Sequence, residues 1–229
     1  MNKQEIAWER EYKNPKLVSK KEEPQADTLR FFKFLKKEQG VLLENLNVLD
    51  LGCGTGRNSN YLAGRDNDVV GIEFSKFALN LARERARENN LKVKYILGDI
   101  GKEYEIKDSS IDLVLDITSS NSLDEKGREV YLKEVFRVLK PGGYFFVRAL
   151  AKEGNKNVKN LLKQSPGREK DTYILKEIGL TERVFTRKDF IDLYSKYFEI
   201  LKMDKKTNYS KFNGRVYKRD YLIVYLKKN

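Results

Sequence analysis

Residues 47–63 constrain the fold of this 229-residue chain more than any other segment. The run 47–51 is short and apolar with one acid, which is typical of a strand buried in a parallel sheet. Three glycines at alternate positions follow in 52–56, and residues 58–63 can begin a helix. Glycines in such a turn let a ligand approach the backbone, and free amides at the helix start face it. Because Arg57 replaces the third glycine of G-x-G-x-x-G, the dinucleotide-binding pattern is incomplete.

Strands and helices alternate along the rest of the chain. Further strands are predicted at 68–73, 93–97, 111–117, 144–150, 198–204 and 217–226. Helices are predicted at 6–12, 26–38, 76–88 after the cap Ser75, 124–139, and 188–197 after the cap Thr186. Residues 140–143 read as a turn, and 154–179 as an irregular lid or substrate loop. This order predicts an α/β fold with a doubly wound, mostly parallel sheet and an antiparallel edge.

Composition excludes several kinds of chemistry. The chain has no histidine and a single cysteine, Cys53, so a zinc site and imidazole-based catalysis are excluded and no metal is expected. It has no long apolar run and no signal-peptide pattern at its start, and we expect a cytoplasmic protein without a membrane span.

The formal charge is +12, but the 46 basic residues are interleaved with 34 acids, which favours a solvated, salt-bridged surface over a nucleic-acid surface. Nucleic acid stays a possible partner. The most basic stretch, Lys202–Arg219, contains interspersed aromatic residues and is the first place to look for an anionic partner.

The motif Asp50-Leu51-Gly52-Cys53-Gly54-Thr55-Gly56 resembles the first motif of class I S-adenosylmethionine-dependent methyltransferases, D/E-x-G-x-G-x-G. Residues 56–63, GRNSNYLA, are similar to the tellurite-resistance type of these enzymes. The length of the chain fits a single domain over 1–229. The resemblance implies a seven-stranded sheet, with residues 1–40 as a helical cap over the cofactor site. It also implies that the glycine turn holds the methionine end of S-adenosylmethionine.

Residues at the ends of the predicted strands complete the expected site. Glu73 ends the second strand, where a carboxylate can accept hydrogen bonds from both ribose hydroxyls, and Phe74 can pack on the adenine. The resemblance implies an adenine contact for Asp99 and Ile100. The full cofactor set is Tyr12, Asp50, Gly52, Cys53, Gly54, Gly56, Arg57, Asn58, Glu73, Phe74, Asp99, Ile100, Asp116 and Ile117.

Asp116 ends the fourth strand and is the candidate catalytic residue, bordering the transferred methyl group. The prolines and aromatic residue that base-methylating enzymes carry after this position are missing, so we predict methylation of a small-molecule acceptor. The alternatives are an RNA or protein methyltransferase that uses the basic surface, a nicotinamide-dependent oxidoreductase, and a non-catalytic nucleoside-binding module. The acceptor and the oligomeric state are not predicted.

Overall fold

The computed structural model describes residues 3–18, 21–212 and 215–229. Its helices are α1 (Lys3–Lys13), α2 (Ala26–Glu38), α3 (Arg57–Ala63), α4 (Lys76–Glu88), the 3₁₀ turn η1 (Ser120–Ser122), α5 (Glu125–Val138), α6 (Lys156–Gln164) and α7 (Arg187–Tyr194). Its strands are β1 (Asn47–Leu51), β2 (Asp68–Glu73), β3 (Val93–Leu97), β4 (Ile111–Ile117), β5 (Leu139–Leu150), β6 (Thr172–Leu175), β7 (Leu180–Arg183), β8 (Glu199–Phe212) and β9 (Arg215–Lys227).

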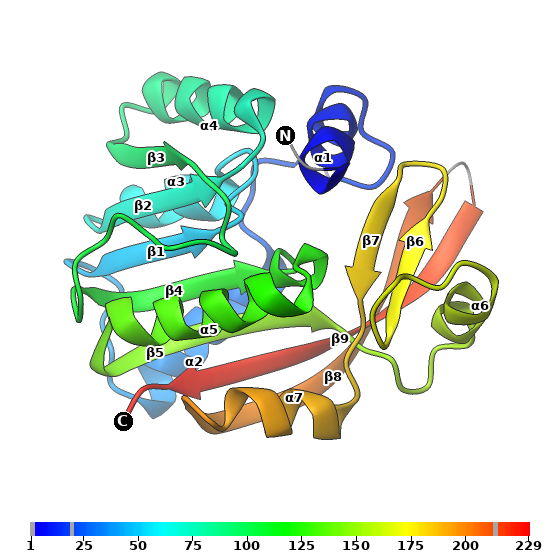
Figure 1. Ribbon diagram of the computed structural model, residues 1–229. Helices are drawn as coiled ribbons and strands as arrows, with labels where there is room; N and C mark the ends of the chain where they lie inside the picture. Colours follow the sequence, from blue (N-terminus) through cyan, green and yellow to red (C-terminus); the bar gives the residue numbers. More distant parts are fainter. Residues whose placement is uncertain (1–2, 19–20, 213–214) are drawn as a thin grey trace.

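Seven strands form one sheet in the order β3-β2-β1-β4-β5-β9-β8 (Figure 1). Strands β1 to β5 are parallel, and β9 runs antiparallel to both of its neighbours. From β1 the chain winds outward through β2 to β3 and then returns to β4, so the winding direction changes between β1 and β4. The predicted doubly wound sheet is confirmed, and its carboxyl ends at β1 and β4 form the switch point where such folds bind ligands.

Alternate residues of each strand supply two separate cores. Val114 of β4 packs with α5 and α7 on one face of the sheet, and Leu113 and Leu115 pack with α2 and α3 on the other. Figure 1 shows α5 and α7 in front of the sheet and α2 behind it. Since successive strand residues point to opposite faces, this alternation decides which helix each polar residue near a strand end can reach.

Two segments that were not predicted to be helix or strand contain regular structure. Residues 140–143 lie inside β5, where the register between β4 and β5 shifts and Gly142 takes a φ of 78°. A strand can continue through such an irregularity because the bulge absorbs the extra residues. Residues 154–179 are not irregular: they hold α6 and β6, and β6 pairs with β7.

The last two strands are longer than predicted and form a hairpin that extends past the rest of the sheet. Most of the basic segment Lys202–Arg219 lies on this hairpin, where Tyr209 is 72% exposed. Residues 213–214, and the side chains of 210–215, lie outside the described part of the chain.

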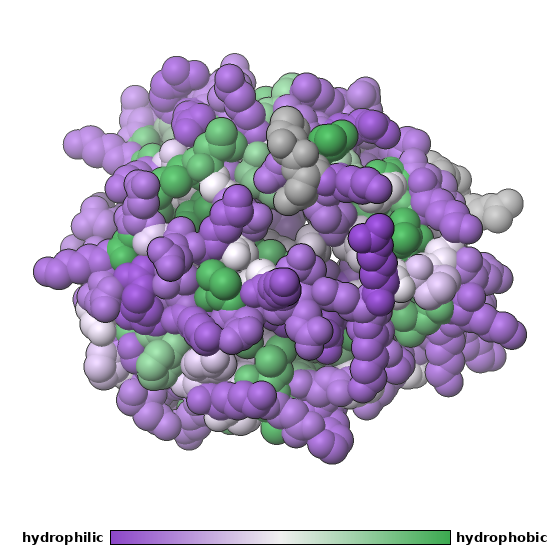
Figure 2. Space-filling model, in the orientation of Figure 1, coloured by the Kyte–Doolittle hydropathy of each residue, from purple (hydrophilic) through white to green (hydrophobic). Residues whose placement is uncertain are grey.

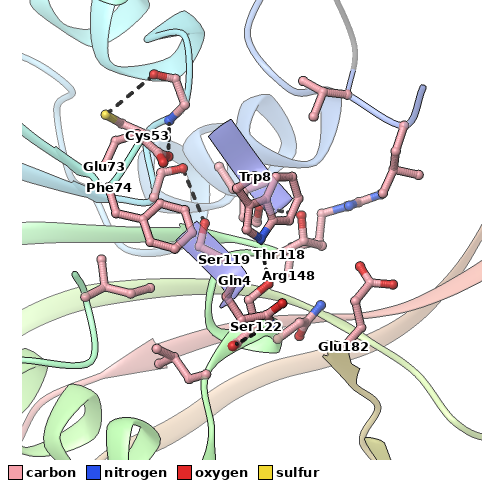
Figure 3. A pocket seen from close by; sticks show the side chains of 18 of the residues that line it. Gln4, Trp8, Cys53, Glu73, Phe74, Thr118, Ser119, Ser122, Arg148 and Glu182 are labelled. Atoms are coloured by element: carbon pink, nitrogen blue, oxygen red, sulfur yellow. Dashed lines mark hydrogen bonds between the residues drawn. The ribbon is translucent and has the colours of Figure 1, made fainter. Parts of the chain in front are cut away.

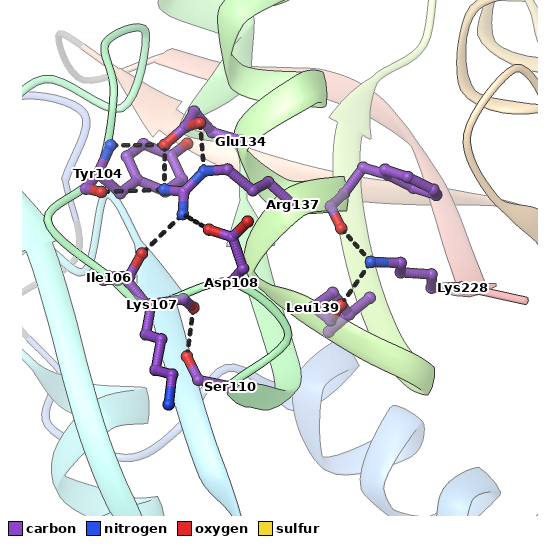
Figure 4. Close-up of polar contacts among 10 residues, drawn as sticks. Tyr104, Ile106, Lys107, Asp108, Ser110, Glu134, Arg137, Leu139 and Lys228 are labelled. Carbon is purple, nitrogen blue, oxygen red and sulfur yellow. Dashed lines mark hydrogen bonds and ion pairs between the residues drawn. The ribbon is translucent and has the colours of Figure 1, made fainter.

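A polar cluster fixes the loop after β3 and the end of α5 (Figure 4). Arg137 pairs with Glu134 and Asp108, and it also donates to the carbonyl oxygens of Tyr104 and Ile106. The Lys228 ammonium donates to carbonyl oxygens of Phe136 and Leu139, which satisfies carbonyl groups at the end of α5. These contacts hold the C-terminal strand and α5 in place next to the core.

None of the helices in the described ranges combines the length and the apolar character that crossing a membrane requires. Figure 2 shows hydrophilic side chains over most of one face, with hydrophobic residues in small separate groups.

The core on the α5 side should be sensitive to truncation. Phe145 is fully buried and contacts the rings of Tyr131, Tyr194 and Phe198. We expect Phe145→Ala to lower the free energy of unfolding by about 3–5 kcal/mol, because it removes apolar contacts and leaves a cavity. Urea titration followed by circular dichroism measures this loss. Leu97→Ala, at a side chain that is 55% exposed, serves as the control and should stay within about 0.5 kcal/mol of the parent. Equal losses in the two variants would contradict this description of the core.

Candidate active site

The glycine turn between β1 and α3 is packed tightly on two sides. Gly52 and Gly54 have φ angles of 65° and 55°, in the left-handed region that favours glycine. A Cβ atom on Gly52 would lie 2.2 Å from the Ser119 Oγ, and one on Gly54 would lie 2.6 Å from the Tyr12 hydroxyl. Tyr12 of α1 therefore covers the turn at Gly54. A side chain at Gly52 or Gly54 would collide with Ser119 or Tyr12, so the turn could not pack against them.

Gly56 also has a left-handed φ, of 80°, but a side chain there would meet other neighbours. A Cβ atom there would lie 2.3 Å from the Tyr95 hydroxyl and 2.9 Å from the Ala82 Cβ. Gly56 does not line the cavity described below; it lets α3 pack against α4 and β3. Next to it, the Arg85 guanidinium of α4 donates to the Thr55 hydroxyl at 2.7 Å and steadies the turn.

Glu73 is 3% exposed at the end of β2. Its carboxylate accepts hydrogen bonds from the amides of Gly54 (3.1 Å) and Ser75 (2.9 Å). Burial raises the pKa of Glu73 to about 7, although these amides oppose the rise. The glycine turn and the end of β2 are thus joined by a carboxylate that is costly to keep charged without a ligand.

Asp50 and Arg57 lie together beneath the turn. Asp50 is 1% exposed and accepts a 2.6 Å hydrogen bond from the Ser59 hydroxyl. Burial raises the pKa of Asp50 to about 6, while the Ser59 hydroxyl and Arg57 oppose the rise. Burial also lowers the pKa of Arg57, with the nearby Arg148 acting in the same direction. Among the described residues, no ion pair or hydrogen bond engages the Arg57 guanidinium, which faces the cavity.

These groups border one cavity of about 1380 Å³ at the carboxyl ends of the strands (Figure 3). The predicted site residues that line it are Tyr12, Asp50, Gly52, Cys53, Gly54, Arg57, Asn58, Glu73, Phe74, Asp99, Ile100 and Ile117. Two of them also have local structural roles. The Asp99 carboxylate accepts a hydrogen bond from the backbone amide of Gly101 at 2.8 Å. The Asn58 side-chain oxygen accepts one at 2.9 Å from the backbone amide of Gln25, the residue just before α2. The structure therefore brings together residues that are far apart in the sequence.

Asp116 does not line this cavity. It is fully buried on the α5 side, where the Tyr131 hydroxyl donates to one oxygen at 2.6 Å. The other oxygen accepts hydrogen bonds from the backbone amides of Ser119 and Ser120, at 2.9 and 3.2 Å. With both oxygens occupied, Asp116 fixes the turn after β4, and Ser119 of that turn contacts the Gly52 carbonyl at 3.3 Å.

Most of the residues that build the far end of the cavity were not predicted from the sequence. Arg148 lies two residues before the end of β5, Tyr221 and Arg219 belong to β9, and Glu182 belongs to β7. Trp8 is tied to the Ser122 hydroxyl at 3.1 Å, and the Gln4 amide group both donates to and accepts from the backbone of Thr181. In Figure 3, Trp8 and Gln4 reach across the cavity from α1.

No group of three or more side chains suited to bind a metal ion occurs within residues 3–18, 21–212 and 215–229. The polar groups around the cavity are instead backbone amides, carboxylates and guanidiniums, which suit a polar organic ligand.

The raised pKa of Glu73 predicts a pH effect in the ligand-free protein. Its folded pKa of about 7 lies above the ordinary 4.5, so its stabilising contribution is present at low pH and is lost as pH rises through about 7. Glu73→Gln lacks this titration. We therefore expect its melting temperature, relative to the parent, to increase by about 3–10 °C from about pH 5 to about pH 8.

Thermal melts of the two proteins in the absence of ligand test this. Glu129→Gln, at a solvent-exposed helix position, is the control and should follow the parent over this range. Parallel profiles for Glu73→Gln and the parent would contradict the raised pKa.

Comparison with known proteins identifies the family. The family model described as "Methyltransferase domain" matches residues 42–179. The ubiquinone biosynthesis O-methyltransferase of Pelagibacter ubique is 28% identical over 169 residues, which are 73% of this chain and 63% of that protein. The chain spans between 36% and 63% of the lengths of the first curated relatives that it matches.

Solved structures agree. A protein from Methanosarcina mazei, described among SAM-dependent methyltransferases, superposes with a TM-score of 0.73 at 27% identity, covering 83% of this chain and 96% of that one. TehB from Haemophilus influenzae shares the fold, with a TM-score of 0.66 at 20% identity over 90% of this chain and 63% of that one. The match over residues 42–179 covers more than half of the sequence, and the chain belongs to the methyltransferase-domain family.

Proposed function

We propose that this protein transfers a methyl group from S-adenosylmethionine to a small-molecule acceptor. The observation that carries the proposal is the single cavity that joins the glycine turn, Glu73 and Asp99 and then continues beyond them to β5, β7 and β9. One end offers the groups that a nucleoside with an amino-acid tail requires, and the other leaves room for a second molecule. The O-methyltransferase relatives support the choice of a small acceptor.

The residues around the near end fit this cofactor. The buried Glu73 carboxylate can accept the ribose hydroxyls, and Phe74 and Ile100 offer apolar surface to the adenine beside Asp99. The turn at Gly52–Gly54 is open to the methionine end beneath Tyr12. The Arg57 guanidinium, with which no described residue forms an ion pair, can bind the methionine carboxylate. Asp50, Cys53, Asn58 and Ile117 complete this wall.

The cofactor supplies an activated sulfonium methyl group, so the protein need only hold the acceptor in line with it and exclude water. This suits a chain without histidine. For Asp116 we propose a positioning role in place of direct contact, because its two oxygens hold Tyr131 and the turn at Ser119 and Ser120. Through Ser119 it supports the Gly52 side of the turn.

Within residues 1–40, which were predicted to cap the cofactor, we propose α1 as the cap, since α2 packs on the face of the sheet with Leu113 and Leu115. Helix α1 is tied to three separate parts of the rim: Gln4 to β7, Trp8 to η1, and Glu9 to the Ser75 hydroxyl at 2.6 Å and the Phe77 amide at 3.2 Å. Contacts of this kind would have to open when ligands enter. The cytoplasmic location stays a prediction.

The family assignment favours methyl transfer over the nicotinamide-dependent alternative. The basic hairpin β8–β9 keeps an RNA or protein acceptor as the competing prediction. Binding of RNA would weaken steeply as salt concentration rises, because counterions are released on binding.

Titration calorimetry with S-adenosylhomocysteine tests the cofactor site. We expect the parent to bind this ligand and to bind NAD much more weakly. Glu73→Ala should weaken binding by about 1–3 kcal/mol, which is about 5- to 150-fold, since it removes charge-assisted hydrogen bonds. Gly54→Val should abolish binding, because its side chain would collide with Tyr12 where the ligand approaches.

Lys188→Ala is the matched control for these variants, because Lys188 is exposed on α7 and pairs only with the neighbouring Asp192. It should bind like the parent. Tighter binding of NAD than of S-adenosylhomocysteine, or unchanged affinity in both site variants, would refute the placement of the cofactor.

A further inference from the structure

Arg148 is the cation most deeply built into the far end of the cavity. Its partner across the sheet is Ile117 of β4, so it lies beside the strand end predicted to border the methyl group. Its side chain points to the α2 face, where Nε donates to the Asp27 carboxylate at 3.1 Å. The guanidinium carbon lies 3.4 Å from the centre of the Tyr221 ring. The side chain is only 8% exposed and is held in one orientation, with part of it lining the cavity (Figure 3).

The charge of Arg148 is only partly balanced. Asp27 is fully buried and is shared among three cations: Arg148, Lys206 at 2.9 Å, and Arg30. One carboxylate therefore faces three positive charges. Arg57, a second guanidinium, is near enough to act on the same region; it is attracted to the buried Asp50, but no ion pair joins the two within the described residues.

Among the described acids at this end of the cavity, Glu169 is partly exposed and Glu182 is buried, and the buried acid does not supply the missing charge. Glu182 is 4% exposed and binds Arg219 through both oxygens, each at 2.9 Å. Its carboxylate also accepts a hydrogen bond from the Tyr173 hydroxyl at 2.7 Å. The Glu182–Arg219 pair is thus balanced within itself, and the excess positive charge stays with Arg148 and its neighbours.

Part of the Arg148 guanidinium is still available. Nε donates to Asp27, and Nη2 lies 3.1 Å from the Asn208 side-chain amide, whose oxygen can accept a hydrogen bond from it. Within the described residues, Nη1 has no hydrogen-bond acceptor. A guanidinium that is held by its back edge and by a tyrosine ring is well suited to bind a carboxylate, because it is already oriented and desolvated.

We propose that the methyl acceptor is a small organic acid whose carboxylate binds Arg148, with its apolar body against Tyr221 and Ile174, which line the same cavity. This inference rests on the proposed methyltransferase function and adds the chemical class of its acceptor. The carboxylate restores the charge balance around Asp27, and it uses the free Nη1 donor.

Binding measurements with the protein saturated with S-adenosylhomocysteine test the proposal. The probes are two matched pairs, benzoate with benzamide and octanoate with octanamide, each pair differing in charge but hardly in size. For at least one pair, we expect the acid to bind the parent at least about 10-fold more tightly than its amide. Arg148→Gln should abolish this preference, and Arg148→Lys should keep part of it because the charge remains.

Arg65→Gln is the matched control, because it removes a guanidinium that also stacks on a tyrosine, Tyr61 at 3.6 Å, but lies outside the cavity. Its preference for acids should equal that of the parent. Absence of a preference for acids in both pairs, or a preference that survives in Arg148→Gln, would overturn the proposal.

Titration with S-adenosylhomocysteine separates this proposal from the function on which it rests. The ligand should bind Arg148→Gln as tightly as it binds the parent. A large loss there would assign Arg148 to the cofactor and overturn the acceptor role. Failure of the parent to bind S-adenosylhomocysteine would refute the proposed function itself.

Discussion

The contact between the Glu73 carboxylate and the amide of Gly54 is the interaction on which the site depends. It joins the end of β2 to the turn after β1, and it does so with an acid that burial makes costly to ionise. A residue held at such a cost is typical of functional sites, where a ligand later provides the missing partners. The same turn requires glycine at positions 52 and 54, because it passes between Ser119 and Tyr12 and a side chain at either position would collide with one of them.

The half of the site around the glycine turn and Glu73 could be predicted from the sequence because short local patterns specify it. A buried strand, a glycine turn and an acid at the next strand end fix both the fold class and the position of Glu73. The alternation of strands and helices then predicts the sheet order, because the connections in such folds are short and of one hand. Asp116 shows the limit of this reasoning. Its position at a strand end is right, but strand alternation directs it toward Tyr131 of α5 and away from the cavity.

The far half depends on contacts between segments that no local pattern connects. Arg148 binds Asp27 of α2, which lies 121 residues earlier, and Gln4 binds Thr181 of β7. In the short helix α6, Val158, Leu161 and Leu162 do follow a helical spacing after the cap Asn155. The pattern is hard to recognise in the sequence because the neighbouring residues are mostly polar. Because the far end of the cavity is built from these pairings, the acceptor class that we propose could not be predicted from the sequence.

A crystal structure of the protein with S-adenosylhomocysteine tests the central claim most directly. The account predicts ligand density in the cavity, with the ribose hydroxyls within hydrogen-bond distance of Glu73 and the amino-acid end at Gly52–Gly54 beneath Tyr12. Density at another place, or a ligand in this cavity that leaves Glu73 bound only to the amides of Gly54 and Ser75, would contradict it.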